Sequence, residues 1–511
     1  MIPGSDTGVS IRAPAFRSVP REALITDVGI AAFARAAPGT IAIVDGDERV
    51  SYAELDARVN RVARVLSGAG VAAGERVAPA LRNRAEFFEV AWAAARLGAE
   101  VVPVAWRAKD DEVAYVVRDA GARLLVREDD GPGAGMALSE LRAARATAAA
   151  APIDGAPDPA IPAFRYYTSG TTGRPKAVER ERSPADRFVA AARALPTFAG
   201  LDRPAEVHLA CGPLYHTAPC AYAQYGLLFG HTVVVMERFD AARSLELVER
   251  ERVTWTHMVP INFVRIIALG PTGRDLSSIR RVLHGAAPCP PHVKRAIMAV
   301  FPPGSVWEYY GMTEGLATVI TAEEWGRKPG SVGRAAAGTH VSVRGPGGRA
   351  LGPGEIGLVY LTPSARFSYA GDEAKTAEAW DGDAFTVGDM GFLDSDGYLF
   401  LTDRAQDLII SGGANVYPAE VEAVLCEHPA VSDCAVVGVP DDEWGESVLA
   451  IIEVASPLDA GELIAFARER LAHYKCPRAV VAVDELPRDP NGKVRKRELR
   501  DRYWAGRATR I

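Results

Sequence analysis

The stretch Tyr166-Tyr-Thr-Ser-Gly-Thr-Thr-Gly-Arg-Pro-Lys176 follows a short apolar approach at 161–164. Glycine lets a turn bring backbone N–H groups close to a ligand, and hydroxyl side chains add donors without bulk. Arg174 and Lys176 supply positive charge for a polyanion. The spacing Gly-x-x-Gly-x-x-Lys differs from a Walker A loop, which needs Gly-x-x-x-x-Gly-Lys followed by Ser or Thr. The stretch therefore predicts a loop that holds a triphosphate, with a polar turn between two strands as the alternative.

Length, net charge and cysteine content exclude several classes of protein. A chain of 511 residues exceeds what one core usually holds, so we expect two or more domains. A net charge of −7 argues against nucleic acid or an anionic membrane as the main partner. Residues 1–12 show no secretory signal, and six cysteines without Cys-x-x-Cys spacing predict reduced packing residues of a cytoplasmic protein. The least polar long run, 219–236, is broken by glycines and polar residues, which favours buried core over a membrane span.

Helix-like and strand-like segments alternate in the first quarter of the chain. Ser51, with Glu54 three residues later, predicts a capping box that opens a helix. A turn and strand at 74–81, a helix at 86–97 and a short strand at 101–104 follow. Strand, helix and strand at this spacing form a βαβ unit, which implies a mainly parallel sheet. The buried face of the first helix is expected to carry Leu55, Val59, Val62, Ala63 and Leu66.

Two segments are predicted to lie outside the sheets. The stretch 143–162 is rich in Ala, Pro, Gly and Asp without lasting periodicity, which predicts a surface connector. The mixed charge run 179–182 is predicted to be the solvated face of a helix.

Three further strings carry residues suited to nucleotide chemistry. In Glu308-Tyr-Tyr-Gly-Met-Thr-Glu314 an aromatic ring can stack on adenine, a threonine can reach a phosphate and a carboxylate can hold Mg²⁺. Asp389 lies shortly before Asp396-Gly397, a hairpin turn between apolar runs. Lys493 follows Asn-Gly on a turn rich in proline and glycine, where a solvated turn residue is the alternative.

In this order, the strings resemble those of the adenylate-forming superfamily, which contains acyl-CoA synthetases, peptide-synthetase adenylation domains and luciferases. They look most like a free-standing acyl-CoA ligase. The resemblance implies an α/β fold with a large N-terminal domain, 1–403, of mainly parallel, helix-covered sheets and a β-rich subdomain. It also implies a small mobile α+β C-terminal domain, 404–511, that carries a catalytic lysine.

The resemblance assigns roles at an ATP site with Mg²⁺. Tyr310 would stack on adenine, Asp389 would accept the ribose hydroxyls, and Glu314 would hold the metal. The implied catalytic residues are Lys493, Thr313, Glu314 and His216. The implied ATP-binding residues are Thr168, Ser169, Gly170, Thr171, Thr172, Gly173, Lys176, Gly285, Ala286, Ala287, Tyr309, Tyr310, Gly311, Met312, Asp389 and Arg404.

The resemblance also implies an acyl pocket and a tunnel for CoA. Aromatic and small residues in the pocket suggest an apolar acid, which could be aliphatic, aromatic or polycyclic. Rotation about Gln406, where the family usually has Lys or Asp, would bring Gly412 and Gly413 to line the tunnel, with Trp444 near the CoA nucleotide. The implied pocket residues are Tyr215, His216, Ala218, Tyr222, His257, Gly285 and Met312.

The activity implied is that of an ATP-dependent acid–CoA ligase. The acid would attack ATP to give acyl-AMP and pyrophosphate, and domain rotation would then allow transfer of the acyl group to CoA. Only eighteen residues follow Lys493, so no fused carrier domain is expected. Loading of a separate carrier protein is the alternative. A non-catalytic nucleotide-binding protein and a luciferase-like oxidation are weaker alternatives, and oligomeric state is not predicted.

Overall fold

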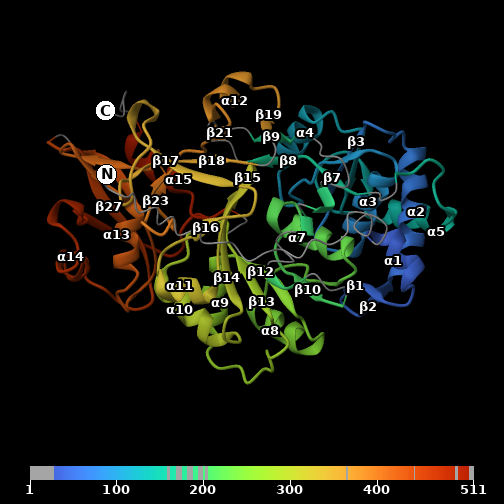
Figure 1. The fold of residues 1–511 in the computed structure, drawn as a ribbon, viewed down its shortest axis with the longest axis horizontal. Coiled ribbons are helices and arrows are strands. Elements are labelled where there is room, and N and C mark those ends of the chain that lie inside the picture. Colours follow the sequence, from blue (N-terminus) through green and yellow to red (C-terminus); the bar gives the residue numbers. More distant parts are fainter. Residues whose placement is uncertain are drawn as a thin grey trace, which may run out of the picture.

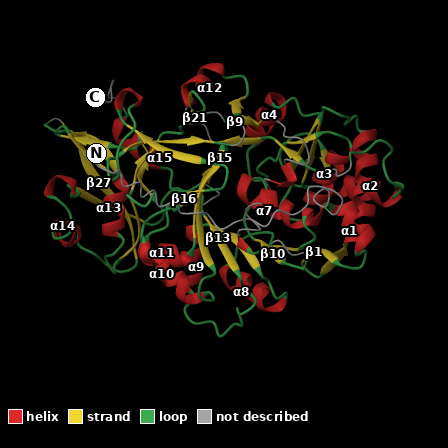
Figure 2. Ribbon diagram, viewed as in Figure 1, coloured by secondary structure: helices red, strands yellow, loops and turns green. Residues whose placement is uncertain are grey.

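Figures 1 and 2 show the fold as a computed structural model. The structure describes residues 28–157, 161–168, 175–180, 188–190, 192–193, 199–201, 205–363, 366–404, 406–441, 443–489 and 493–505. The early elements α1 to α5 lie at one end of the molecule, the long mixed sheet lies in the middle, and the C-terminal elements α13, α14 and β27 lie at the other end (Figure 1).

The first sheet is parallel, with the order β6-β5-β3-β4-β7. Its strands are β3 (Arg76–Ala80), β4 (Glu100–Val101), β5 (Leu124–Arg127), β6 (Met136–Ala137) and β7 (Ala163–Phe164). The helices of this part are α1 (Ile30–Ala36), α2 (Tyr52–Gly68), α3 (Ala85–Arg96), α4 (Asp110–Asp119) and α5 (Leu138–Thr147). The predicted βαβ unit is confirmed, since α3 lies between β3 and β4 in the sequence and the two strands pair in parallel.

The start and the buried face of α2 also follow the prediction. The Ser51 hydroxyl accepts a hydrogen bond from the Glu54 N–H at 3.2 Å, which satisfies one of the free donors of the first turn. The five apolar residues expected on the inner face of the helix are all fully buried: Leu55, Val59, Val62, Ala63 and Leu66.

A larger mixed sheet has the order β16-β15-β14-β13-β12-β10-β11-β1-β2, parallel from β14 to β1 and antiparallel at both edges. Its strands are β1 (Ile41–Asp45), β2 (Glu48–Ser51), β10 (Val207–Ala210), β11 (Thr232–Val235), β12 (Trp255–Met258), β13 (Arg281–His284), β14 (Val306–Met312), β15 (Gly315–Ile320) and β16 (Arg334–Ala335). The accompanying helices are α7 (Thr217–Leu228), α8 (Ala241–Arg250), α9 (Pro260–Ala268), α10 (Pro291–Val300) and α11 (Ala322–Arg327).

Alternate strand residues of this sheet enter different cores. Ile43 and Val233 pack with α2, α3 and α7, whereas their neighbours Val44 and Val234 pack with α8, α9 and α10. Because successive side chains of a strand point to opposite faces, the two groups of helices cover opposite faces of the sheet. The run 219–236, predicted to be core, is α7 and β11 and is largely buried.

A β-rich part follows and consists of two smaller sheets. One is antiparallel, with the order β20-β21-β18-β22-β23 and with β17 on β18, and the other has the order β19-β9-β8. Their strands are β8 (Tyr166–Thr168), β9 (Lys176–Arg180), β17 (His340–Arg344), β18 (Gly357–Thr362), β19 (Phe367–Tyr369), β20 (Trp380–Asp381), β21 (Ala384–Phe385), β22 (Asp389–Leu393) and β23 (Leu399–Arg404), with helix α12 (Glu373–Ala379) and the 3₁₀ turn η2 (Pro346–Gly348) beside them. The hairpin turn predicted at Asp396-Gly397 joins β22 to β23.

The C-terminal part has its own sheet and core. The sheet order is β25-β24-β27-β26, with β28 parallel to β27. Its strands are β24 (Ile409–Ser411), β25 (Ala414–Val416), β26 (Val431–Asp441), β27 (Gly445–Val454) and β28 (Ala479–Val483). The helices are α13 (Pro418–Leu425), α14 (Ala460–Arg468) and α15 (Lys496–Trp504), with the 3₁₀ turn η3 (His473–Lys475). A separate buried cluster lies within this part, so the expected α/β fold with a small α+β C-terminal part is confirmed.

Two local predictions are wrong. Residues 143–147, expected to be connector, complete helix α5, because alanine and arginine favour helix even where no apolar stripe is visible. Glu179 and Arg180, expected on a helix face, form the end of β9, where they pair with Ser368 and Phe367 of β19. Charge alternation cannot distinguish a solvated helix from a polar strand. No helix within the described ranges is both long and apolar enough to cross a membrane.

Candidate active site

Three predicted nucleotide residues from the strands β14, β22 and β23 meet in one group. The Tyr310 hydroxyl, from β14, donates a hydrogen bond to Asp389 Oδ2 at 2.5 Å. Arg404 Nε lies 3.2 Å from Asp389 Oδ1, because the first residue of β22 lies opposite the last residue of β23. Burial, together with the Asp389 carboxylate, raises the pKa of Tyr310 well above its usual value. Tyr310 therefore stays a neutral hydrogen-bond donor to Asp389.

Lys493 approaches this group from the C-terminal part. Its backbone N–H donates to Asp489 Oδ1 at 2.9 Å, and the Asp489 N–H donates to the Lys493 carbonyl at 2.8 Å, so the backbone of Lys493 is held to Asp489. Burial and the nearby Arg404 guanidinium lower the pKa of Lys493 to about 8, opposed by the Asp389 carboxylate among others. The predicted catalytic lysine thus lies within electrostatic range of both Asp389 and Arg404.

A second group forms around Glu314. Tyr369 donates its hydroxyl hydrogen to Glu314 Oε1 at 2.7 Å. Lys176 forms an ion pair with Asp372, the N-cap residue of α12. Burial lowers the pKa of Lys375, Glu314 opposes this effect, and the Lys176 charge adds to it. Lys375 therefore lies within electrostatic range of both Glu314 and Lys176. Sequence reasoning missed Tyr369, Asp372 and Lys375, although their aromatic, acidic and basic types on one short segment were visible.

The two strands that flank the predicted phosphate loop, β8 and β9, are described by the structure. Residues 169–173, for which contact with phosphates is predicted, lie outside the described residues. Thr168 ends β8 and pairs in antiparallel register with Lys176, the first residue of β9. β8 and β9 therefore lie side by side, and Lys176 begins β9 opposite the end of β8.

His216 and Thr313 are brought together through the start of α7. His216 is the N-cap residue of α7, and its ring centroid lies 4.5 Å from that of Tyr215. The neighbouring Thr217 hydroxyl is 3.1 Å from the Thr313 hydroxyl. Burial lowers the pKa of His216 to about 4, so its imidazole is neutral near pH 7. His216 can therefore contact an acid without adding charge.

The segment Gly285-Ala286-Ala287 lies at the end of β13, against β14. A Cβ atom at Gly285 would lie 2.6 Å from the Tyr309 carbonyl oxygen, so only glycine fits. Ala286 has φ of 68°, in the left-handed region that non-glycine residues rarely adopt. Such conformations concentrate at ligand sites, which agrees with the predicted position of this segment beside adenine and the acyl group.

The predicted acyl residues fall into two places. His257 Nε2 lies 2.8 Å from the Tyr309 hydroxyl, and the Tyr222 ring stacks on His257 with centroids 5.1 Å apart. Ala218 packs against the same buried cluster. Met312 instead packs with residues of the β-rich part. Tyr309, predicted only as an ATP residue, is thus a direct neighbour of the acyl residues Tyr222 and His257.

The residues predicted for the CoA tunnel lie together in the C-terminal part. Gly412 has φ of 57°, and a Cβ atom there would lie 2.3 Å from Trp444 Cε3. Gly413 has φ of 78° and faces open space. The Arg478 guanidinium lies 4.5 Å from the centroid of the Trp444 ring. Gln406, the predicted hinge residue, accepts a hydrogen bond from Arg500 at its backbone carbonyl, at 3.1 Å.

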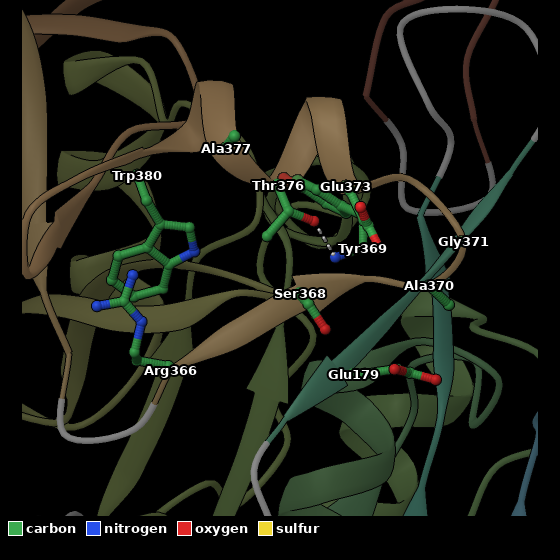
Figure 3. A pocket seen from close by; sticks show the side chains of 10 residues that line it. All are labelled: Glu179, Arg366, Ser368, Tyr369, Ala370, Gly371, Glu373, Thr376, Ala377 and Trp380. Carbon is green, nitrogen blue, oxygen red and sulfur yellow. Dashed lines mark hydrogen bonds between the residues drawn. The ribbon is translucent and has the colours of Figure 1, made fainter.

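A surface pocket of about 410 Å³ lies beside β9, β19 and α12 (Figure 3). In Figure 3 the Arg366 guanidinium lies over the Trp380 ring, and the Tyr369 N–H donates to the Thr376 hydroxyl at 2.9 Å. None of the residues predicted for the ATP or acyl site lines this pocket, although its lining residue Tyr369 donates to Glu314. Its lining residues are Glu179, Arg366, Ser368, Tyr369, Ala370, Gly371, Glu373, Thr376, Ala377 and Trp380.

The chain combines two helix-covered sheets, a β-rich part and a small C-terminal part that carries Lys493. This architecture is that of an adenylate-forming enzyme. The chain belongs to the AMP-binding enzyme family. Residues 30–365 match the model of the AMP-binding enzyme, and residues 420–493 match that of its C-terminal domain. The superfamily expected from the sequence is therefore confirmed, whereas the roles of individual site residues stay predictions.

Relatives cover almost the whole chain. A feruloyl-CoA synthase of Amycolatopsis is 36% identical over 491 residues, which are 92% of this chain and 97% of that protein. The fatty acid–acyl-carrier-protein ligase ScoC of Streptomyces coeruleorubidus is 34% identical over 505 residues, or 93% and 95%. The o-succinylbenzoate CoA synthetase of Bacillus subtilis, solved with its acyl-adenylate intermediate, has a TM-score of 0.82 at 30% identity over 92% and 97% of the two chains. It has also been solved with ATP and magnesium.

Proposed function

We propose that the chain is an ATP-dependent acid–CoA ligase that forms an acyl-AMP from a hydrophobic carboxylic acid and then transfers the acyl group to CoA. The observation that carries this proposal is the position of Lys493. A lysine from the C-terminal part approaches the Tyr310–Asp389–Arg404 group, where a ribose and an α-phosphate would bind. A cation aimed at the α-phosphate is the group that attack of a carboxylate on that phosphate requires.

The first half-reaction joins two anions. A carboxylate oxygen of the acid attacks the α-phosphorus of ATP, and the bond to pyrophosphate breaks. Charge develops on the α-phosphate oxygens, where an aimed cation stabilises the transition state most strongly. Lys493 and Arg404 supply cations on this side, while Lys375 supplies one near Glu314 and Lys176 lies near Lys375. Holding acid and nucleotide in one pocket supplies much of the remaining acceleration.

Glu314 fits the role of a magnesium ligand. It is a carboxylate with one oxygen held by Tyr369, and the other oxygen accepts no hydrogen bond from a residue that the structure describes. Magnesium typically takes one or two protein carboxylates and keeps its remaining sites for water and phosphate oxygens. When bound, the ion would neutralise part of the triphosphate charge and so favour pyrophosphate as a leaving group.

Thioester formation requires a second arrangement, because Lys493 would obstruct the path of a thiol to the acyl carbonyl. We place the domain boundary between residues 403 and 404, with Gln406 as the hinge. Rotation would remove Lys493 and bring Gly412 and Gly413 towards the acyl carbonyl, where the absence of a side chain at Gly413 leaves room for the thin pantetheine arm. The CoA sulfur then attacks the carbonyl carbon, and AMP leaves.

Acid-dependent release of pyrophosphate from ATP, measured over a panel of carboxylic acids with and without CoA, tests this function. We expect release with a subset of the acids and thioester formation when CoA is added. Asp389→Asn should raise the KM for ATP, because it removes the charge that holds Arg404 and would accept the ribose. No acid-dependent release across the panel would leave a non-catalytic nucleotide-binding protein as the better description.

Loading of a carrier protein is the second candidate, and the 34% identity to the carrier-protein ligase ScoC favours keeping it. Both candidates share the adenylation step and differ in the thiol that accepts the acyl group. Adenylation without thioester formation on free CoA, followed by acylation of a supplied phosphopantetheinyl carrier protein, would identify this second candidate.

A further inference from the structure

Two cysteines of the C-terminal part lie side by side. Cys426 is the C-cap residue of α13, and Cys434 lies in β26, which packs against this helix. Their Sγ atoms are 3.3 Å apart, and the Cys434 thiol also donates to the Glu422 carbonyl at 3.5 Å. Between the two sulfurs the Cys426 thiol is then the donor. A disulfide bond is about 2.05 Å long, so its formation requires the sulfurs to approach by only about 1.3 Å.

The surroundings of the pair favour reaction at Cys426 first. Cys426 is partly exposed, whereas Cys434 is buried. The Arg488 guanidinium lies within electrostatic range of Cys426. A nearby cation favours the thiolate, which is the form of cysteine that reacts with peroxides. The hydrogen bond with Cys426, together with burial, raises the pKa of Cys434 well above its usual value, so Cys434 stays a thiol until Cys426 has reacted.

Residues beside both cysteines hold the segment that carries Lys493. Asp433, next to the buried cysteine in the sequence, forms an ion pair with Arg488. Glu422, whose carbonyl accepts from the buried thiol, pairs through its carboxylate with Lys496 Nζ at 2.8 Å. Arg488 precedes Lys493 in the sequence and Lys496 follows it. The segment is therefore fastened to β26 before Lys493 and to α13 after it.

We propose that Cys426 and Cys434 form a site of reversible oxidation by peroxides that controls the position of Lys493. The Cys426 thiolate attacks one peroxide oxygen, the O–O bond breaks, and a sulfenic acid forms while the hydroxide that leaves is protonated to water. The Cys434 sulfur then attacks the sulfenic sulfur, the S–O bond breaks, and hydroxide leaves with the Cys434 proton as a second water. The two thiols are thereby oxidised to one disulfide, and the peroxide is reduced by two electrons. A dithiol reductant restores both thiols by exchange.

The disulfide would act on catalysis through the same two attachments. Closing the bond draws the end of α13 and β26 together, next to the residues that hold the Lys493 segment at either side. A misplacement of about 1 Å in the active site can lower a rate by about 10². Resting on the proposed ligase function, we expect the oxidised protein to release pyrophosphate at least about tenfold more slowly than the reduced protein.

Peptide mapping of the full chain tests the site without reference to activity. After treatment with hydrogen peroxide, cleavage following Glu427 separates the two cysteines, so their peptides stay joined only through a disulfide. We expect this joined pair to form and to disappear with dithiothreitol. Cys476, a buried cysteine whose thiol contacts backbone carbonyls, should remain free. Thiols that stay reduced, or Cys426 oxidised to a sulfinic acid without the joined pair, would overturn the inference.

Pyrophosphate release by the same samples tests the effect on Lys493. The oxidised protein should regain its rate with dithiothreitol. Cys426→Ser keeps a hydrogen-bond donor to Cys434 and should keep its rate through the peroxide treatment, whereas the control Cys476→Ser should lose it as the unmodified protein does. An unchanged rate in the disulfide form would overturn the control of Lys493. No release by the reduced protein with any acid would overturn the ligase function instead, and peptide mapping would then decide whether the oxidation site exists.

Discussion

The ammonium of Lys294 lies 2.8 Å from Glu308 Oε2 in the interior of the protein, and it also contacts His284 Nε2. Lys294 is on α10, whereas His284 is the last residue of β13 and Glu308 lies in β14, directly before Tyr309. Burial and the Lys294 charge lower the pKa of His284 well below its usual value, so its ring is neutral. One buried cation therefore joins the two strands that carry the segments predicted to contact adenine and acid.

Removal of this cation should destabilise the protein. Lys294→Met leaves the Glu308 carboxylate buried without its partner, and breaking a buried pair in this way typically costs about 3–5 kcal/mol. Differential scanning fluorimetry should show a clearly lower melting temperature. The double variant Lys294→Met/Glu308→Leu removes both charges and should recover most of the loss.

An exposed ion pair provides the control for the buried Lys294–Glu308 pair. Arg327→Met breaks a surface pair with Glu323 on α11 and should leave the melting temperature unchanged, because surface pairs contribute little. A double variant no more stable than Lys294→Met would show that the buried pair does not act as described.

Lys493→Ala should separate the two half-reactions. It removes a cation aimed at the α-phosphate, and loss of one such aimed donor typically lowers the rate by about 10²–10³. Acid-dependent pyrophosphate release should fall accordingly, while conversion of preformed acyl-AMP and CoA to thioester should continue. Lys475→Ala, which removes a cation paired with Glu420 elsewhere in the C-terminal part, should affect neither step. Equal loss of both steps in Lys493→Ala would contradict the proposed role.

The sequence was sufficient for the main features of the fold because its signals there are local. A capping serine, one apolar helix face and short apolar strands are decided within a few residues, and α2, β3 and α3 follow the prediction. Residues 143–147 and 179–180 were assigned wrongly. Their state depends on a sheet partner or on propensity rather than on an apolar pattern.

The residues of the candidate site also fall into those that the sequence predicts and those that it does not. Tyr310, Asp389 and Arg404 lie in distinctive sequence strings, and the sequence predicts all three. They meet in one group. Tyr369 and Lys375 were not predicted, because their importance arises from a strand and helix far along the chain that fold back beside Glu314. The double role of Tyr309 was also hidden, since only packing shows that its ring meets Tyr222.

The pKa of Lys493 predicts how adenylation depends on pH. Lysine is charged below its pKa, and burial lowers that pKa to about 8, so the ammonium is lost as the pH rises through 8. If the charged form stabilises the transition state, kcat/KM for pyrophosphate release should decline above this pH. Lys493→Arg keeps its charge at every accessible pH and should lack the decline, whatever its absolute rate. A decline of the same shape in Lys493→Arg would assign it to another group.

A substitution at Gly413 should have the opposite effect to Lys493→Ala: it should spare adenylation and slow thioester formation. A Cβ atom there meets nothing within 4 Å in this arrangement, so added bulk should spare adenylation. In the rotated arrangement the same bulk would narrow the path of the pantetheine arm. Because φ at Gly413 is 78°, most side chains would add backbone strain, and asparagine is the substitution that tolerates this region best. Gly413→Asn should therefore release pyrophosphate at nearly the rate of the unmodified protein but form thioester more slowly, measured with preformed acyl-AMP. Equal rates in that second assay would place the thiol path elsewhere.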